Sequence, residues 1–142
     1  MTGVQTCALP ISAEIAKQVP CDLVPDIIFS SRYLSSVLRT SGGGVVDVQH
    51  SSGVRTLQDK KIVVPQIAAA DIVTTGSFHA GCVAAYYGKP LSLSQSNTHK
   101  MQGLAADMGI PYMSDTPALA NPDYVPDAKR RIAGMIERLK QL

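Results

Sequence analysis

One stretch decides the fold of this chain: Asp71-Ile-Val-Thr-Thr-Gly-Ser-Phe-His79-Ala-Gly-Cys-Val-Ala-Ala-Tyr-Tyr-Gly-Lys-Pro90, followed by Leu91-Ser-Leu93. Residues 72–75 are β-branched throughout, which predicts a strand buried on both faces. Residues 78–87 are small and apolar enough to pack as a helix beside that strand. Gly88 ends this helix and Pro90 opens the next strand. The order of strand, helix and strand predicts a βα unit with parallel strands and a right-handed crossover.

The segment before this stretch continues the alternation. Residues 45–48 form a compact apolar run that predicts a strand. Residues 56–68 have a roughly helical pattern, but Pro65 lies inside it, where a proline can split a helix. The sequence therefore predicts a second strand and helix on the amino side of the first.

The segment after the stretch adds further elements. Residues 98–108 predict a helix that Gly109 stops, and residues 110–113 predict a short last strand. A final helix is expected over residues 126–142, with an apolar stripe and a basic, solvated face. The sequence thus predicts an α/β fold, a Rossmann-like parallel sheet flanked by helices.

The first forty residues are not predicted to be part of the Rossmann-like domain. Residues 2–11 look like the in-frame translation of a sequencing adapter, so we expect residues 1–12 to be non-native. Residues 21–29 predict an edge strand or connecting segment, because Pro25 cannot donate into a central ladder, and residues 31–40 have helical spacing. We therefore expect residues 13–40 to be an interdomain segment or the remnant of an N-terminal part, and residues 41–142 to form one Rossmann-like domain.

Composition excludes several classes of function. A length of 142 residues suits one domain, and the apolar runs are far shorter than the roughly 20 residues that cross a bilayer. The formal charge of +2 is too small to indicate nucleic acid. Neither a disulfide framework nor a metal site is indicated by the spacing of the three cysteines, so we expect no metal and a cytoplasmic location.

The chemistry is expected where the strand of residues 72–75 ends. Ligands of open parallel sheets bind beyond the carboxyl ends of the strands, and Gly76, Ser77 and His79 lie there, at the start of a helix. Free N–H groups and the helix dipole favour a phosphate or carboxylate at this place. The helix end keeps His79 neutral until an anion binds, and binding would then protonate it, as a general acid requires. The pattern leaves open a histidine that only caps or packs in the first turn.

A second candidate region follows the strand of residues 91–93. The polar loop Gln95-Ser-Asn97-Thr98-His99 precedes Lys100, and parallel strands bring this loop to the same edge as His79. We expect Asn97, Thr98 and Lys100 to contact the same ligand. The alternative for Lys100, a solvated lysine on a helix, is also open.

Together these residues resemble a known family. Val45-Val-Asp-Val, Ile67-Ala-Ala-Ala-Asp71-Ile-Val-Thr-Thr-Gly-Ser-Phe-His79-Ala, Tyr87-Gly-Lys-Pro90 and Lys100 resemble the C-terminal domain of polysaccharide pyruvyl transferases, over about residues 44–110. The resemblance implies one half of a GT-B enzyme with two Rossmann-like domains. It therefore also implies an N-terminal domain that precedes this chain.

The same resemblance implies an activity, the transfer of a pyruvyl group from phosphoenolpyruvate to sugar hydroxyls as a ketal in surface polysaccharide biosynthesis. It implies His79 as the general acid, Lys100 as the residue that binds phosphoenolpyruvate, and no cofactor besides this donor. The acceptor would be a sugar or lipid-linked saccharide, which brings such an enzyme near a membrane surface. Family members often have Arg-Leu-His or Ser-Leu-His where this chain has Ser77-Phe78-His79, so we expect this chain to lack the arginine contact to the anion that the first pattern provides. The fragment alone is expected to be inactive.

Two other functions stay open. A nucleotide-sugar glycosyltransferase would share the fold, because fold alone does not fix function. Such enzymes often hold the ribose or donor sugar with glutamate, whereas the only glutamates here are Glu14 and Glu137; Asp47, Asp71 or Asp107 would have to substitute. The third alternative is a non-catalytic fragment or partner-binding module with an exposed apolar face.

Overall fold

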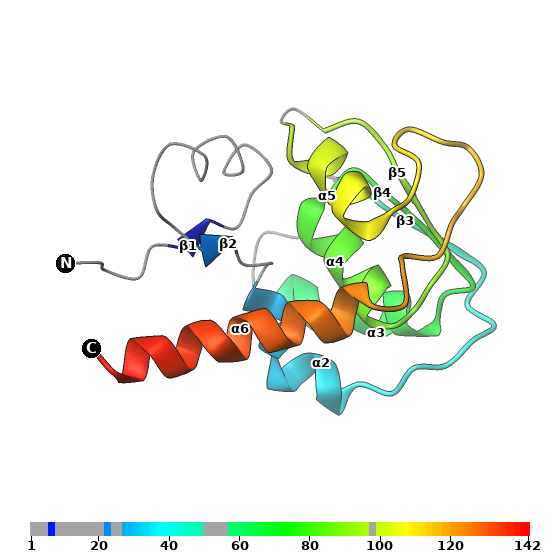
Figure 1. Cartoon of the computed structure of the whole chain (residues 1–142). Coiled ribbons are helices and arrows are strands. Elements are labelled where there is room, and N and C mark those ends of the chain that lie inside the picture. Colours follow the sequence, from blue (N-terminus) through cyan, green and yellow to red (C-terminus); the bar gives the residue numbers. More distant parts are fainter. Residues whose placement is uncertain (1–5, 8–21, 24–26, 50–56, 97–98) are drawn as a thin grey trace.

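A small parallel sheet lies at the centre of the fold. The computed structural model describes residues 6–7, 22–23, 27–49, 57–96 and 99–142 (Figure 1). Three strands pair in the order β3 (Val45–Val48), β4 (Ile72–Thr75) and β5 (Leu91–Leu93), and both pairs are parallel. The predicted α/β class, its parallel sheet and these three strands are confirmed.

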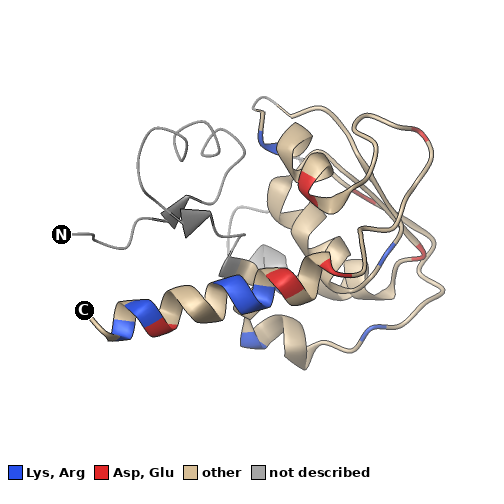
Figure 2. Ribbon diagram, viewed as in Figure 1, with Lys and Arg blue, Asp and Glu red and all other residues tan. Residues whose placement is uncertain are grey.

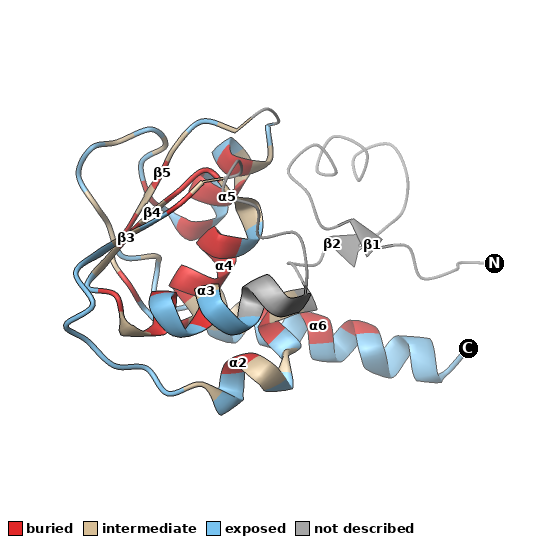
Figure 3. Cartoon of the chain, turned by 180° about the vertical axis from the view of Figure 1, so that it is seen from behind, coloured by how far each residue is buried: buried red, intermediate tan, exposed pale blue. Residues whose placement is uncertain are grey.

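Three helices cover one face of the sheet. They are α3 (Leu57–Ala69), α4 (Phe78–Tyr86) and α5 (Lys100–Met108), and Figures 1 and 3 show them on the same side. Successive strands step across the sheet in one direction, so right-handed crossovers place the connecting helices on one face. No helix of the described residues lies on the opposite face. The prediction that β4 is buried on both faces is therefore wrong: Val73 and Thr75 are buried, while Ile72 and Thr74 are only half-buried.

A second helical layer packs outside α4. It consists of the short 3₁₀ helix η1 (Ile27–Ser30), α2 (Arg32–Ser36) and α6 (Tyr124–Lys140), with α6 running beside η1 (Figure 1). The rings of Phe29 and Tyr124 meet edge to face with centroids 5.6 Å apart. Phe29 and Leu34, from the segment expected to connect domains, thus belong to the same core as the sheet.

The last helix is only partly buried. Ile132 and Met135 of its predicted stripe are buried, but Ile136 and Leu139 are exposed. The basic residues of α6 lie at the surface (Figure 2), and Arg130 pairs with Asp127 at 2.9 Å with three quarters of its side chain exposed. The predicted solvated basic face is confirmed. None of the helices in the described part of the chain has the length and apolarity that crossing a membrane requires.

The amino edge of the sheet is built from polar contacts. The Asp71 carboxylate accepts the N–H groups of Gly42 at 2.9 Å and Gly44 at 3.0 Å, and these hydrogen bonds hold its pKa below the usual value. Gly42 and Gly44 have φ of +92° and +68°, which glycine adopts without strain. Nearby, the buried Lys89 donates to the carbonyl oxygen of Thr40 at 2.5 Å, and burial lowers the pKa of its ammonium group. Asp71 therefore has a structural role at the edge opposite the predicted ligand site.

Several predicted boundaries differ from the structure. Helix α3 continues through Pro65, although proline has no N–H for the carbonyl four residues earlier, because Val64 and Ile67 on the same helix are anchored in the core. Helix α2 is shorter than the predicted segment 31–40. The strand predicted at 110–113 is wrong, since only Tyr112 forms an isolated bridge, to Leu93.

Other boundaries are confirmed or lie outside the description. Gly88 and Gly109 follow α4 and α5 with φ of +63° and +70°, as the predicted stops require. In the first part of the chain, β1 (Thr6–Cys7) pairs in parallel with β2 (Asp22–Leu23). The rest of the predicted non-native segment 1–12 lies outside the described residues.

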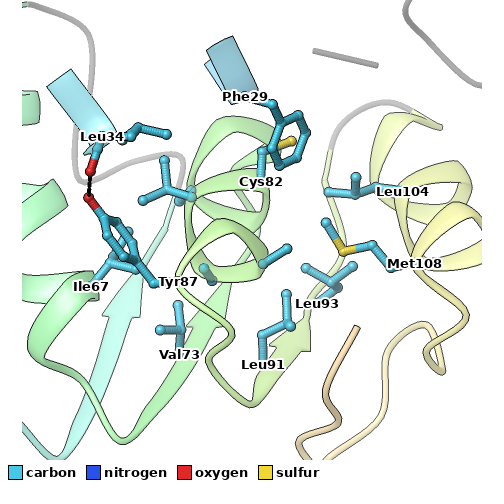
Figure 4. Close-up of a cluster of buried hydrophobic side chains, with 14 of the residues drawn as sticks. Phe29, Leu34, Ile67, Val73, Cys82, Tyr87, Leu91, Leu93, Leu104 and Met108 are labelled. Atoms are coloured by element: carbon cyan, nitrogen blue, oxygen red, sulfur yellow. Dashed lines mark hydrogen bonds between the residues drawn. The ribbon is translucent and has the colours of Figure 1, made fainter. Parts of the chain in front are cut away.

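A buried tyrosine connects the two helical layers (Figure 4). The hydroxyl of Tyr87, which follows α4, donates to the carbonyl oxygen of Leu34 at 2.6 Å. Burial raises the pKa of Tyr87 to about 12 from an ordinary value of 10.0. Between these values the unfolded chain loses the phenolic proton while the folded protein keeps it. The contribution of Tyr87 to stability is therefore complete below the lower value and is lost as the pH rises toward the higher one.

We expect Tyr87→Phe to lower the free energy of unfolding at neutral pH by about 1–3 kcal/mol, because the Leu34 carbonyl keeps only the long 3.4 Å hydrogen bond from the Val37 N–H. The variant should also lose stability less steeply at alkaline pH. Urea unfolding across a pH series measures both effects. Tyr86→Phe is the matched control, since it removes a hydroxyl from the neighbouring half-buried tyrosine and keeps the ring that lies beneath the Lys129 ammonium at 4.7 Å. Equal effects of the two substitutions would contradict this role for Tyr87.

A second prediction concerns Gly43, whose N–H donates to the Ala69 carbonyl at 2.9 Å. A Cβ at position 43 would lie 2.7 Å from that carbonyl oxygen, so the loop before β3 would have to move. Gly43→Ala should destabilise the fold by about 1–3 kcal/mol. The same change at Gly134, an exposed α6 position with nothing within 4 Å, should stabilise it by about 0.5–1 kcal/mol. Thermal unfolding of both variants tests the opposite signs.

Candidate functional site

The carboxyl ends of the three strands converge on Gly76. A Cβ at this position would lie 3.0 Å from Oε1 of Gln49, 3.1 Å from the carbonyl oxygen of Gln95 and 3.2 Å from Oγ of Ser94. Gln49 directly follows β3, Gly76 follows β4, and Ser94 and Gln95 follow β5. Only glycine leaves these polar groups in place, so Gly76 permits the close approach of three strand ends.

The turn from β4 into α4 is fixed by one buried threonine. The hydroxyl of Thr75 donates to the Val48 carbonyl at 2.5 Å and accepts the N–H of Ser77 at 2.9 Å. Ser77 occupies the N-cap position of α4, but its side chain makes no capping hydrogen bond. The first bond of the helix runs from Gly81 N–H to the Ser77 carbonyl at 3.0 Å, so the N–H groups of the first turn lie at the carboxyl edge of the sheet.

His79 is the second residue of α4 and is exposed. Its ring meets the Phe78 ring edge to face, with centroids 5.7 Å apart. The contact with Phe78 fits the alternative of a histidine that packs in the first turn, and the exposure of the side chain leaves the role in ligand binding open as well. The side chain is accessible to a ligand at the positive end of the helix dipole.

Lys100 opens the neighbouring helix and is half-buried. The spacing of α4 and α5 is set by Gly81, because a Cβ there would lie 3.0 Å from Leu104 Cδ2 and 3.2 Å from Leu93 Cδ2. Both helices begin at the carboxyl edge of the sheet, so Lys100 lies at the same edge as His79. The alternative of a solvated lysine on a helix stays open, since part of the Lys100 side chain is exposed.

The candidate residues from the sequence are thus only partly brought together. Gly76, Ser77 and His79 share one turn, and Lys100 begins the adjacent helix. Asn97 and Thr98 lie outside the described residues. Among the residues that the structure describes, no group of three His, Cys, Asp or Glu side chains could hold a metal ion. The buried Cys82 is in the core, where it contributes as an apolar side chain.

Sequence reasoning missed the polar residues around Gly76. Gln49, Thr75, Ser94 and Gln95 were not candidates, although each ends a predicted strand or follows one within two residues. That position was the available signal, because the carboxyl ends of parallel strands share one edge. The pairing of the strands was needed to show that these particular side chains meet.

Comparisons with protein-family models, with curated proteins and with solved structures find no match to this chain. The interpretation of the site therefore rests on its own chemistry. Helix N–H groups, a half-buried lysine and an accessible imidazole provide hydrogen-bond donors, a fixed cation and a group that exchanges protons near neutral pH. This combination suits a small anion that takes up a proton.

Proposed function

We propose that this chain is the donor-binding half of a pyruvyl transferase, which moves a pyruvyl group from phosphoenolpyruvate to sugar hydroxyls. The observation that carries the proposal is the exposed His79 in the first turn of α4, with Lys100 at the start of the adjacent helix. The sequence resemblance to polysaccharide pyruvyl transferases supports it, and so does the parallel sheet that places both residues at one edge.

The proposed reaction uses these groups as follows. Binding of the phosphate and carboxylate at the helix N-termini and Lys100 favours the imidazolium form of His79. His79 then gives its proton to the methylene carbon of phosphoenolpyruvate, which becomes the methyl group, and C2 becomes electrophilic. One sugar hydroxyl adds to C2 and loses its proton to His79. His79 gives this proton to the departing phosphate, a second hydroxyl bonds to C2 in its place and loses its proton to His79, and the ketal is complete.

The wider architecture is part of the same proposal. We place this chain as the C-terminal half of a GT-B enzyme, with a preceding Rossmann-like domain that supplies most of the acceptor site. The enzyme would act in the cytoplasm on a sugar or lipid-linked saccharide at the membrane surface, without metal or cofactor. The chain alone should bind phosphoenolpyruvate but not turn it over.

The positions of the aspartates bear on the nucleotide-sugar alternative. Asp71 holds the glycine loop at the amino edge, and Asp107 lies near the end of α5, away from the carboxyl edge. Of the three candidates for a ribose contact, this leaves Asp47, whose Oδ1 already accepts hydrogen bonds from Thr74 and Gln49. These arrangements favour phosphoenolpyruvate over a nucleotide sugar.

Isothermal titration of the 142-residue chain with phosphoenolpyruvate and with UDP separates the two functions. We expect binding of phosphoenolpyruvate, weakened roughly tenfold or more in Lys100→Ala because a hydrogen bond to a charged group is lost. His99→Ala is the matched control, because His99 is the exposed neighbour of Lys100. Binding of UDP without binding of phosphoenolpyruvate would refute the proposal.

In the two-domain enzyme, His79→Ala should lower kcat by about 10²–10⁴-fold, as expected for loss of a general acid. Lys100→Ala should instead raise the KM for phosphoenolpyruvate. Steady-state kinetics with each substrate varied in turn measures both. An unchanged kcat in His79→Ala would mean that this histidine is structural, and an effect of Lys100→Ala on the acceptor alone would contradict its assignment.

A further inference from the structure

The sheet face without helices carries a row of polar side chains. Asp47, Thr74 and Ser92 are paired across β3, β4 and β5, and their buried neighbours along the strands point toward the helices on the opposite face. The Thr74 hydroxyl donates to Oδ1 of Asp47 at 2.8 Å. A sheet face that is covered by apolar packing would not have such a row, so this face is adapted to polar contacts.

A groove of about 300 Å³ lies over the β4 and β5 part of this row. Thr74, Ser92 and Ser94 line one side, and residues 113–115 line the other. The second wall is tied to the sheet by the Met113 N–H, which donates to the Leu93 carbonyl at 3.0 Å. Met113 has φ of +56°, a left-handed conformation that is rare for residues other than glycine. The wall is thus held in a strained shape beside the sheet.

Ser92 lines this groove with an unsatisfied hydroxyl. Its Oγ is shielded from solvent and has no hydrogen-bond partner within the described part of the chain. Buried polar atoms are nearly always paired, because leaving one unpaired costs free energy. A rotation about the Cα–Cβ bond would let this hydroxyl meet a ligand in the groove.

The remaining polar groups of the groove define the ligand. The Thr74 hydroxyl donates a hydrogen bond to Asp47, and the Ser94 hydroxyl donates one to Gln49 at 3.4 Å. Both oxygens therefore keep lone pairs that can accept a hydrogen bond from a ligand. Asp115 adds a carboxylate, and neither lysine nor arginine occurs among the described residues that line the groove. A ligand that donates hydrogen bonds and has no negative charge suits these acceptors, and Met113, more than half exposed, offers an apolar wall for C–H groups.

We propose that this groove binds a neutral polyhydroxyl ligand, namely a sugar ring. The groove adjoins the candidate anion site, because Ser94 and Gln95 touch Gly76, which precedes Ser77 and His79 in the chain. This assignment rests on the proposed function, in which the ring would be part of the acceptor saccharide. The volume is at the lower limit of the roughly 300–1,000 Å³ of small-molecule sites, which suits one small ligand.

Amide NMR spectra of the 142-residue chain test the proposal by titration with methyl glucoside, methyl galactoside and methyl mannoside. At least one glycoside should shift the amides of residues 92–95 and 113–115. Ser92→Ala should weaken its binding about 3–10-fold, the effect of one hydrogen bond, while the midpoint of thermal unfolding stays equal or rises. Thr74→Val should also weaken binding. Ser36→Ala, whose hydroxyl donates to the Tyr33 carbonyl on α2, should leave binding unchanged.

Three results would overturn the proposal: no shift with any of the glycosides, wild-type affinity in Ser92→Ala, or shifts of the groove amides by phosphoenolpyruvate in place of a sugar. A parallel titration with phosphoenolpyruvate, read at the amides of residues 77–80, reports separately on the proposed function. Shifts by a glycoside without binding of phosphoenolpyruvate would remove pyruvyl transfer and leave the sugar site. Binding of phosphoenolpyruvate without shifts by any glycoside would remove the sugar site alone.

Discussion

The burial of α4 on every side is the constraint on which the rest of the structure depends. This helix contacts β4 and β5 on one side, α3 and α5 on its flanks, and η1 on the outside. All its residues from Ala80 to Ala85 are buried, and all are small. A helix that is apolar all round is stable only when neighbours enclose it. Small side chains allow that enclosure, and the volume of the core comes from larger neighbours such as Phe29 and Leu104.

The enclosure of α4 also determines where chemistry can occur. Because α4 cannot shift without disrupting five neighbouring elements, its first turn is held at the carboxyl edge of the sheet with His79 exposed. The amino edge, by contrast, is occupied by internal contacts of Asp71 and Lys89. The stabilising polar contacts and the proposed ligand site thus lie at opposite edges of the sheet. Substitutions at the two edges should have largely independent effects, since distant sites without shared partners are close to additive.

The sequence was sufficient for the elements around this helix. The β-branched run 72–75, the small apolar run 78–87 and the glycines at 88 and 109 each depend on local chemistry, and all of them formed as predicted. Features that depend on which other part of the chain packs against a segment could not be predicted from the local sequence. The helix through Pro65 is one case, because packing of Val64 and Ile67 outweighs one missing hydrogen bond. The half-covered face of β4 is another, since composition does not reveal which face lacks a helix.

The same limit applies to the candidate site. His79 and Gly76 were identified from a strand that ends before a helix, which is a local pattern. The meeting of Gln49, Ser94 and Gln95 at Gly76 depends on strand order and register, which one sequence does not determine. The unpaired hydroxyl of Ser92 depends on the path of residues 113–115 as well. Long-range pairing therefore decides which side chains complete a site, whereas local pattern decides where the site lies.

In the proposed pyruvyl transfer, charge at the carboxyl edge would take the place of an arginine at the position of Ser77. A helix N-terminus amounts to about half a positive charge, and it disfavours protonation of a histidine beside it. An anion reverses that effect, because its negative charge stabilises the imidazolium. His79 would then acquire its positive charge only when the donor is bound, and it would supply both the missing cation and the proton. The groove beside Gly76 is lined by hydroxyls and the Asp115 carboxylate, so an anionic donor would be repelled from it and would favour the helix N-terminus instead.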